Sequence, residues 1–209
     1  MSTAVVYVHG LWLSGHEAFL LGRRIEKERG YPWQVFNYAS TMLTMTEISA
    51  ALAAFIAGLE APRVHLVGHS LGGLAILRCL QNHPQLPPGR VVFLGTPSLA
   101  STAAHAVARF RFGRAIMGQA VTEELLNVHD RSWTHERELG IIAGNQPLGL
   151  ARLVVDFQEA NDGTVAVSET RLPGAKAHIV LPVSHTGLLL SKQVAHEVCQ
   201  FLATGHFGD

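Results

Sequence analysis

The stretch from Val64 to Leu77 places the strongest constraint on how this chain can fold. An apolar run is followed by residues 68–73, Gly-His-Ser-Leu-Gly-Gly, and then by a second apolar run. This order predicts a strand, a sharp turn and a helix, with the serine hydroxyl pushed out above the end of a sheet. Side chains at Gly68 and Gly72 would collide with the backbone in such a turn. We interpret Ser70 as a nucleophile; the alternative is an ordinary glycine-rich turn.

Apolar runs of strand length alternate with segments of helical periodicity along the whole chain. The expected strands are 4–9, 33–38, 64–69, 91–94, 140–145 and 178–183, and the expected helices are 15–30, 44–61, 71–83 and 188–201. Ser14 with Glu17, and Thr44 with Glu47, have the spacing of a capping box at a helix start. Alternation of this kind predicts right-handed crossovers and a parallel sheet with helices on both faces.

Composition narrows the class of protein further. The chain has 209 residues, which favours one domain over 1–209, and 48% hydrophobic against 15% charged residues excludes a disordered chain. The formal net charge is zero, so the sequence lacks the basic footprint of a nucleic-acid-binding protein. Cys79 and Cys199 have no metal-binding spacing, and we expect both in the core.

The sequence also bears on location and on membrane insertion. The first ten residues have neither a basic region nor a long apolar region typical of a secretory signal, so we expect a cytoplasmic location. No apolar run reaches the roughly 18 residues that a membrane span requires.

The alternation of strands and helices is interrupted between residues 98 and 138. This stretch lacks strand periodicity, contains helical pieces and includes a basic aromatic cluster at 109–114. Insertions of this length are often functional, and we expect a helical cap or lid over the sheet. The basic cluster is either a solvated surface of this cap or a transient contact with a lipid interface or an anionic substrate.

A serine nucleophile needs an imidazole to take its proton and an acid to orient the imidazole. Of 12 histidines, His185 directly follows the last expected strand and is therefore on the same sheet edge as Ser70. His65 lies within a strand, His178 begins one, and His69 lies beside the nucleophile. We predict that His185 is the base.

Three aspartates compete for the role of the acid. Asp162 lies in an Asn-Asp-Gly turn after a β-branched segment, and the order Ser70, Asp162, His185 is that of hydrolases with this topology. Asp130 and Asp156 remain alternatives, because such a turn is often only a turn.

At this point the motifs resemble a known family. Residues 8–10, 68–73, 94–97, 161–165 and 184–188 are similar to motifs of the α/β-hydrolase serine esterases and lipases, especially small lipases and GPI inositol-deacylase-like hydrolases. The resemblance implies a minimal α/β-hydrolase fold of about six mostly parallel strands, flanked by helices and carrying a cap. It also favours Asp162 as the acid, and it implies an oxyanion hole formed by the backbone N–H groups of Leu11 and Leu71.

The resulting hypothesis is a serine hydrolase that cleaves carboxylic esters of short to medium acyl chain through an acyl-serine intermediate, without metal or organic cofactor. Thioesterase and acyltransferase activity would use the same three residues, and a non-catalytic binding protein with this fold is the remaining alternative. The expected ligand is a small-molecule ester. Candidate lining residues of the acyl pocket are Trp12, Leu13, Phe110, Phe112, Ile116 and Met117.

Overall fold

A computed structural model of the chain describes residues 3–99, 102, 105, 117–125, 131–148 and 157–208. Within these residues one sheet has six strands in the order β2-β1-β3-β4-β5-β6, and all neighbouring strands are parallel. The strands are β1 (Ala4–Val8), β2 (Trp33–Phe36), β3 (Val64–His69), β4 (Val91–Leu94), β5 (Leu139–Gly144) and β6 (Ala177–Leu181). The expected fold class is confirmed.

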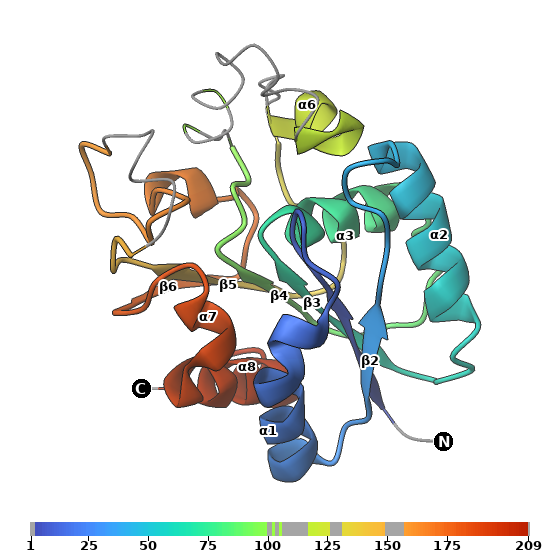
Figure 1. Cartoon of the computed structure of the whole chain (residues 1–209). Helices are drawn as coiled ribbons and strands as arrows, with labels where there is room; N and C mark the ends of the chain where they lie inside the picture. Colours follow the sequence, from blue (N-terminus) through green and yellow to red (C-terminus); the bar gives the residue numbers. More distant parts are fainter. Residues whose placement is uncertain are drawn as a thin grey trace.

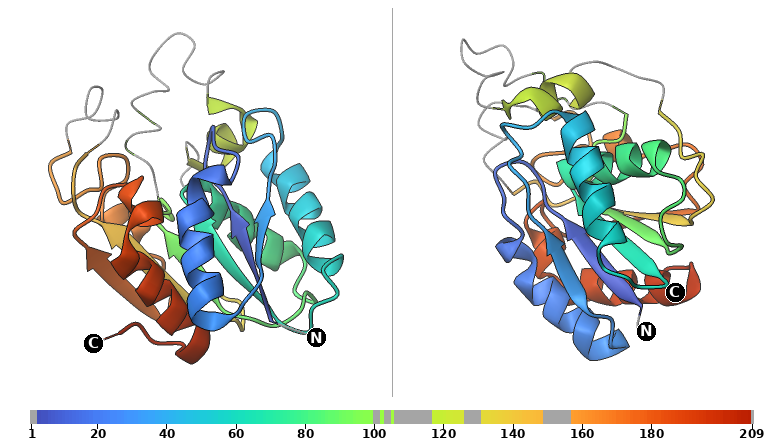
Figure 2. Two further views of the ribbon diagram at one scale, coloured as in Figure 1. Left: turned by 60° about the horizontal axis from the view of Figure 1, so that its bottom comes forward. Right: turned by 90° about the vertical axis from the view of Figure 1, so that its right-hand side faces the viewer.

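Helices cover both faces of this sheet (Figures 1 and 2). The helices in the described ranges are α1 (Phe19–Arg29), α2 (Met45–Ala57), α3 (Leu71–Asn82), α6 (Gln119–Leu125), α7 (Gly187–Leu190) and α8 (Lys192–Thr204). Val8 and Leu66 pack in the core cluster that contains α2 and α3, whereas Tyr7 and Val67 pack in the cluster that contains α1 and α8. Alternate residues of the central strands are therefore buried on opposite faces, as in a parallel sheet.

The two predicted capping boxes have different outcomes. Thr44 caps α2 as expected: its hydroxyl accepts the N–H of Glu47 at 3.2 Å, and the Glu47 carboxylate accepts the N–H of Thr44 at 2.8 Å. The Ser14 hydroxyl instead contacts Nδ1 of His16 at 3.0 Å, and a 3-10 turn over His16–Ala18 precedes α1. The first expected helix therefore begins with a tighter turn than the pattern predicted.

The expected C-terminal helix over 188–201 is two helices rather than one. Ser191 has an extended backbone, with φ −69° and ψ 134°, which ends α7. Its hydroxyl accepts the N–H of Val194 at 3.3 Å and so caps the start of α8. The prediction of a continuous helix was wrong because the apolar periodicity continues across this break.

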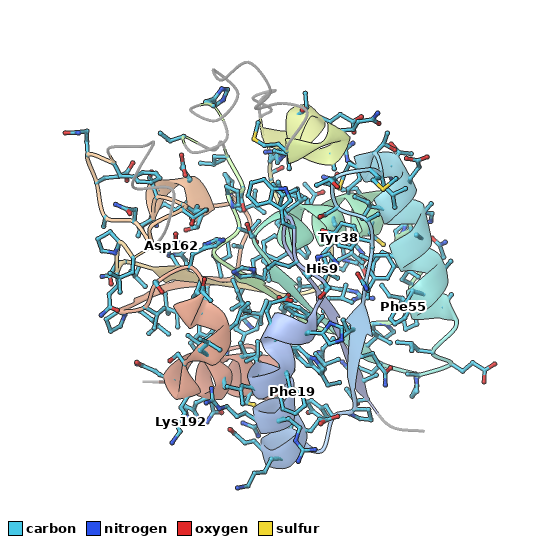
Figure 3. The ribbon with its side chains drawn as sticks, viewed as in Figure 1. His9, Phe19, Tyr38, Phe55, Asp162 and Lys192 are labelled. Atoms are coloured by element: carbon cyan, nitrogen blue, oxygen red, sulfur yellow. The ribbon has the colours of Figure 1, made fainter. Side chains whose placement is uncertain are left out.

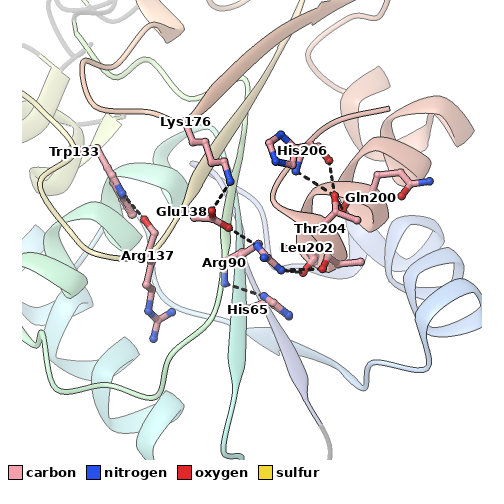
Figure 4. Close-up of polar contacts among 11 residues, drawn as sticks. His65, Arg90, Trp133, Arg137, Glu138, Lys176, Gln200, Leu202, Thr204 and His206 are labelled. Atoms are coloured by element: carbon pink, nitrogen blue, oxygen red, sulfur yellow. Dashed lines mark hydrogen bonds and ion pairs between the residues drawn. The ribbon is translucent and has the colours of Figure 1, made fainter. Parts of the chain in front are cut away.

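Polar contacts join the amino ends of the strands, opposite the edge that carries Ser70 (Figure 4). Glu138 pairs with Arg90 at 2.6 Å and also with Lys176, and these two hydrogen-bonded cations hold the pKa of its carboxyl below the usual range. Arg90 also donates to the carbonyl oxygen of Leu202 at 3.0 Å, and its N–H donates to Nδ1 of His65 at 2.8 Å. This end of the sheet is tied to α8 by a structural network.

Strand β6 forms one edge of the sheet and is half-buried, with Val180 exposed.

In the described part of the chain, no helix has the length and apolar character needed to cross a membrane. Cys79 and Cys199 are free and buried, as expected.

Helix α3 approaches the sheet without intervening side chains, because glycine occupies its contact positions. A Cβ atom at Gly68 would lie 2.6 Å from the Cα atom of Gly73, and one at Gly72 would overlap the carbonyl oxygen of Val8. A Cβ atom at Gly73 would overlap the hydroxyl of Thr96. The first turn of α3 therefore lies directly against β1 and the loop after β4.

Gly72→Ala is expected to lower the free energy of unfolding by about 2 kcal/mol or more, because the new methyl group can be accommodated only if β1 or α3 moves. Urea unfolding monitored by circular dichroism measures this change. Gly58→Ala is the matched control, since its Cβ atom would meet backbone oxygens only at 3.5 and 3.6 Å and its φ is −70°. Equal effects of the two substitutions would contradict the proposed close approach.

Candidate active site

Ser70 occupies a strained backbone position between β3 and α3. Its φ is 54° and its ψ is −123°, and a positive φ costs a non-glycine residue about 1 kcal/mol or more. The N–H of Ser70 donates to the carbonyl oxygen of Leu94 at 2.9 Å, and its own carbonyl accepts the N–H of Gly73 at 3.1 Å. These bonds hold the turn in a conformation that presents a half-buried serine side chain at the carboxyl edge of the sheet.

The loop after β1 lies directly against Ser70. A Cβ atom at Gly10 would lie 3.1 Å from the Cβ atom of Ser70. Leu11 follows Gly10 in this loop, and Leu71 is the first residue of α3, where backbone N–H groups have no acceptor within the helix. The two predicted oxyanion donors thus belong to the segments that flank Ser70.

His9 fixes the peptide group between Gly10 and Leu11. Tyr38 donates its N–H to Nε2 of His9 at 3.2 Å, so the proton of the neutral imidazole is on Nδ1, which donates to the carbonyl oxygen of Gly10 at 2.7 Å. The Tyr38 hydroxyl donates to the carbonyl oxygen of His9 at 2.8 Å, and the two rings stack with centroids 4.3 Å apart (Figure 3). In a trans peptide, the Leu11 N–H points away from this carbonyl. These contacts support the structural role that we predict for His9.

This contact also explains why β2 is shorter than expected. The pattern predicted a strand over 33–38, whereas β2 ends at Phe36. Tyr38 leaves the strand to bond with His9, and it is buried.

Asp162 is a buried carboxylate at the same edge of the sheet, 1% exposed (Figure 3). Its Oδ1 atom accepts the N–H groups of Thr164 at 2.9 Å and Val165 at 2.7 Å. The turn is closed by the N–H of Asp162, which donates to the carbonyl oxygen of Val165 at 3.1 Å. Backbone donors therefore satisfy one carboxylate oxygen and leave Oδ2 free to face another group.

Oδ2 of Asp162 faces His185, which follows β6. Nδ1 of His185 lies 2.6 Å from Oδ2, and the N–H of His185 donates to the carbonyl oxygen of Asp162 at 2.9 Å. Because an ionised carboxylate only accepts, the neutral imidazole carries its proton on Nδ1, and Nε2 is free to take another proton. The structure thus brings the predicted acid and the predicted base into direct contact.

Gly95, directly after β4, lies next to the Asp162–His185 pair. It follows β4 with φ 56°, and a Cβ atom there would lie 3.0 Å from both Asp162 Oδ2 and His185 Nδ1. Within the described residues no hydrogen bond joins the Ser70 hydroxyl to His185. Such bonds are often long in enzymes without bound substrate and tighten when substrate binds.

His69 also contacts the candidate base, and sequence reasoning assigned it no role. Its Nε2 lies 3.2 Å from the carbonyl oxygen of His185, and the two rings are 4.6 Å apart. Burial, with a smaller contribution from His185, holds the pKa of His69 well below the ordinary value. The sequence feature that could have indicated this contact is the position of His69 directly before Ser70.

The candidate pocket residues have diverse environments. Trp12 is 61% exposed, and its backbone N–H donates to Oγ of Ser40 at 3.0 Å, whereas Leu13 is half-buried. Met117 is buried in the core cluster that contains α2 and α3, and the adjacent Gly118 packs against the backbone of Thr41. The remaining members of the predicted pocket, and the competing aspartates, lie outside the described residues: Phe110, Phe112, Ile116, Asp130 and Asp156.

A partly buried ion-pair network connects α6 with α3 and with Arg131, and the sequence pattern did not indicate it. Glu124 pairs with Arg78 of α3 at 2.6 Å and with Arg131 at 2.8 Å. Arg131 also donates to the carbonyl oxygen of Ser98 at 3.1 Å. These contacts join both ends of the 98–138 stretch to α3. The basic cluster at 109–114 lies outside the described residues.

Comparisons with known proteins identify the fold. No protein-family model and no curated protein matches the sequence. Among solved structures, the mature lipase BlEst2 of Bacillus licheniformis is 21% identical, with a TM-score of 0.76 over 98% of this chain and 92% of that chain.

Two further solved structures are similar to this chain over nearly its whole length. The pyrethroid hydrolase of Sphingobium faniae JZ-2 is 16% identical, with a TM-score of 0.65 over 98% of both chains. The lin2722 product of Listeria innocua is 16% identical, with a TM-score of 0.63 over 100% of this chain and 96% of that chain. The chain therefore has the α/β-hydrolase fold that these lipase and hydrolase structures share.

Proposed function

We propose that this protein is a serine hydrolase of carboxylic esters, with Ser70 as the nucleophile, His185 as the base and Asp162 as the acid. The observation that carries the proposal is the 2.6 Å contact between His185 Nδ1 and Asp162 Oδ2. It lies at the edge of the sheet where the strained turn presents Ser70. Two structures with this fold are named a lipase and a pyrethroid hydrolase, which supports hydrolytic chemistry here.

In the first half of the reaction, Ser70 Oγ attacks the ester carbonyl carbon while its proton passes to Nε2 of His185. The Asp162 carboxylate holds the imidazole in the required tautomer and stabilises the imidazolium. The tetrahedral intermediate then expels the alcohol, which takes the proton back from His185. The product of this step is an ester between the substrate acyl group and Ser70.

The backbone N–H groups of Leu11 and Leu71 stabilise the oxyanion of the tetrahedral intermediate. Each donor of this kind contributes about 3 kcal/mol to the transition state. The contact of His9 with the carbonyl oxygen of Gly10 supports this role, because it fixes the orientation of the peptide that carries the Leu11 donor. In the second half, His185 activates water, which cleaves the acyl-Ser70 ester and releases the acid.

The acyl pocket lies beside Trp12 and Leu13 in this proposal; much of the cap predicted over residues 98–138 lies outside the described residues. Trp12 supports the assignment because it is an exposed aromatic residue in the loop that contacts Ser70. An exposed aromatic side chain in the loop beside Ser70 is suited to contact an acyl chain, because ligand sites are lined mainly by apolar and aromatic side chains. Thioesters and acyl transfer would require the same acyl-enzyme, so a substrate panel has to include them.

Ser70→Ala is expected to reduce hydrolysis of p-nitrophenyl butyrate at least about 10³-fold and to abolish labelling by a fluorophosphonate, because both need the serine oxygen. Initial rates and gel fluorescence measure the two effects. Ser168→Ala, which changes an exposed serine, is the control and should retain both. An inactive, unlabelled parent, or a fully active Ser70→Ala variant, would refute the proposed hydrolase.

Asp162→Asn is expected to lower kcat roughly 10²- to 10⁴-fold. The amide oxygen can still accept the N–H groups of Thr164 and Val165, but its NH₂ group would face Nδ1 of His185 and favour the wrong tautomer. Steady-state kinetics on the same ester tests this. Asp130→Asn is the matched comparison, and a large loss there with little loss at Asp162 would move the acid role to Asp130.

Trp12→Ala is expected to lower kcat/KM more for p-nitrophenyl octanoate than for the acetate, since a longer acyl chain makes more contact with the indole. Initial rates over an acyl chain-length series measure the preference. Phe19→Ala removes a comparably exposed aromatic ring from α1 and should leave the series unchanged. A uniform effect of Trp12→Ala on all chain lengths would exclude Trp12 from the acyl pocket.

A further inference from the structure

His69 connects the segment that carries the candidate nucleophile with the segment that carries the candidate base. It is the last residue of β3 and precedes Ser70, so its Cα atom lies about 3.8 Å from that of Ser70. Its side chain reaches across the sheet edge, where Nε2 lies 3.2 Å from the carbonyl oxygen of His185. The two loops come from strands that are separated in the sheet by β4 and β5.

The direction of this hydrogen bond follows from the chemistry of its two partners. A carbonyl oxygen only accepts, so Nε2 of His69 carries a proton and donates it. Nδ1 of His69 is buried and has no hydrogen-bond partner among the described residues. The ring is buried, 2% exposed, and burial favours the neutral imidazole with a single N–H group. That N–H group is directed to His185.

The backbone of His185 is thereby held on both sides. Its N–H donates to the carbonyl oxygen of Asp162 at 2.9 Å, and its carbonyl oxygen accepts the N–H of His69. The first bond orients the base relative to the acid. The second bond orients it relative to the nucleophile, because His69 and Ser70 share a rigid peptide unit. The rings of His69 and His185 also touch, with centroids 4.6 Å apart.

We propose that His69 is a positioning residue that sets the distance between Ser70 Oγ and His185 Nε2 by donating a hydrogen bond to the His185 carbonyl. The inference rests on the proposed ester hydrolysis. Its consequence is kinetic: loss of the donor lets the base shift relative to the nucleophile, which impairs proton transfer but leaves substrate binding intact. A displacement of about 1 Å in a reacting group can cost roughly 10²-fold in rate.

Three substitutions at position 69 distinguish the effect of losing the hydrogen bond from the effect of changing the side-chain packing. Glutamine places an N–H donor the same number of bonds from Cα as Nε2 of histidine. Asparagine places its donor one bond short, and leucine fills space without a donor. We expect His69→Leu and His69→Asn to lower kcat about 10- to 100-fold with KM unchanged. His69→Gln should recover most of the parental kcat.

The experiment measures kcat and KM for p-nitrophenyl butyrate, with each rate divided by the concentration of sites titrated with a fluorophosphonate. Titration removes the contribution of misfolded protein. His65→Leu is the matched control: His65 is equally buried, lies on the same face of β3 four residues earlier, and its Nδ1 accepts a bond from Arg90 at the opposite edge. This variant should keep the parental kcat per titrated site.

Parental kcat in His69→Leu, a loss confined to KM, a glutamine variant as slow as the leucine variant, or an equal loss of kcat in His65→Leu would each overturn the proposal. The expected pattern in all four variants supports it. A parent enzyme that neither hydrolyses the ester nor reacts with the fluorophosphonate would instead refute the proposed hydrolase. The failure of the two proposals is therefore distinguishable.

Discussion

The close approach of α3 to the sheet is the constraint on which the rest of the site depends. Glycine at 68, 72 and 73 lets the first turn of α3 lie against the backbone of β1 and β3 and against the side chain of Thr96 in the loop after β4. Ser70 lies in the sharp turn between these contacts, and the turn requires a positive φ at Ser70, which is energetically unfavourable for a residue with a side chain. The same contact brings the loop after β1 against the serine. Packing therefore sets where the turn at Ser70 lies, and the hydrogen bonds of Ser70 and His9 then hold the turn and the loop after β1 in place.

The carboxylate of Asp162 imposes a second requirement. An isolated buried charge is costly, and such a group persists only when hydrogen bonds satisfy it. Two backbone N–H groups occupy one oxygen and His185 occupies the other. The turn at 161–165 is thus more than a connection, because it prepares a carboxylate whose remaining hydrogen-bonding direction points at one imidazole nitrogen. The structure supplies here the orientation that the motif only suggested.

Much of the sheet was predictable from sequence because its strands are buried on both faces, which leaves continuous apolar runs such as that of β4. The placement of Ser70 and His185 at one edge followed from parallel strand direction, whereas only the resemblance to α/β-hydrolases favoured Asp162 over Asp130 and Asp156. Breaks in helices, and contacts between residues that are distant in the sequence, were harder to predict. Ser191 interrupts an unbroken apolar periodicity, and Tyr38 leaves β2 because of a partner 29 positions away.

The ion pairs of Glu124 and the bond from His69 to His185 join residues that are distant in sequence, and no local pattern encodes such pairs. The sequence pattern also gave no sign that Arg131, in the 98–138 stretch, is buried. The sequence therefore points to candidate catalytic side chains more readily than to the side chains that hold them in place.

The location of β6 at the edge of the sheet affects how the protein loses function. Asp162 and His185 precede and follow this half-buried strand, whereas Ser70 belongs to the central part of the sheet, between β1 and β4. Edge elements with few buried contacts open at lower free energy than the core around them. Local opening of β6 would separate Asp162 and His185, the proposed acid and base, from Ser70 while the central strands remain folded. Thermal inactivation would then be governed by the edge of the sheet, at temperatures below the global unfolding transition.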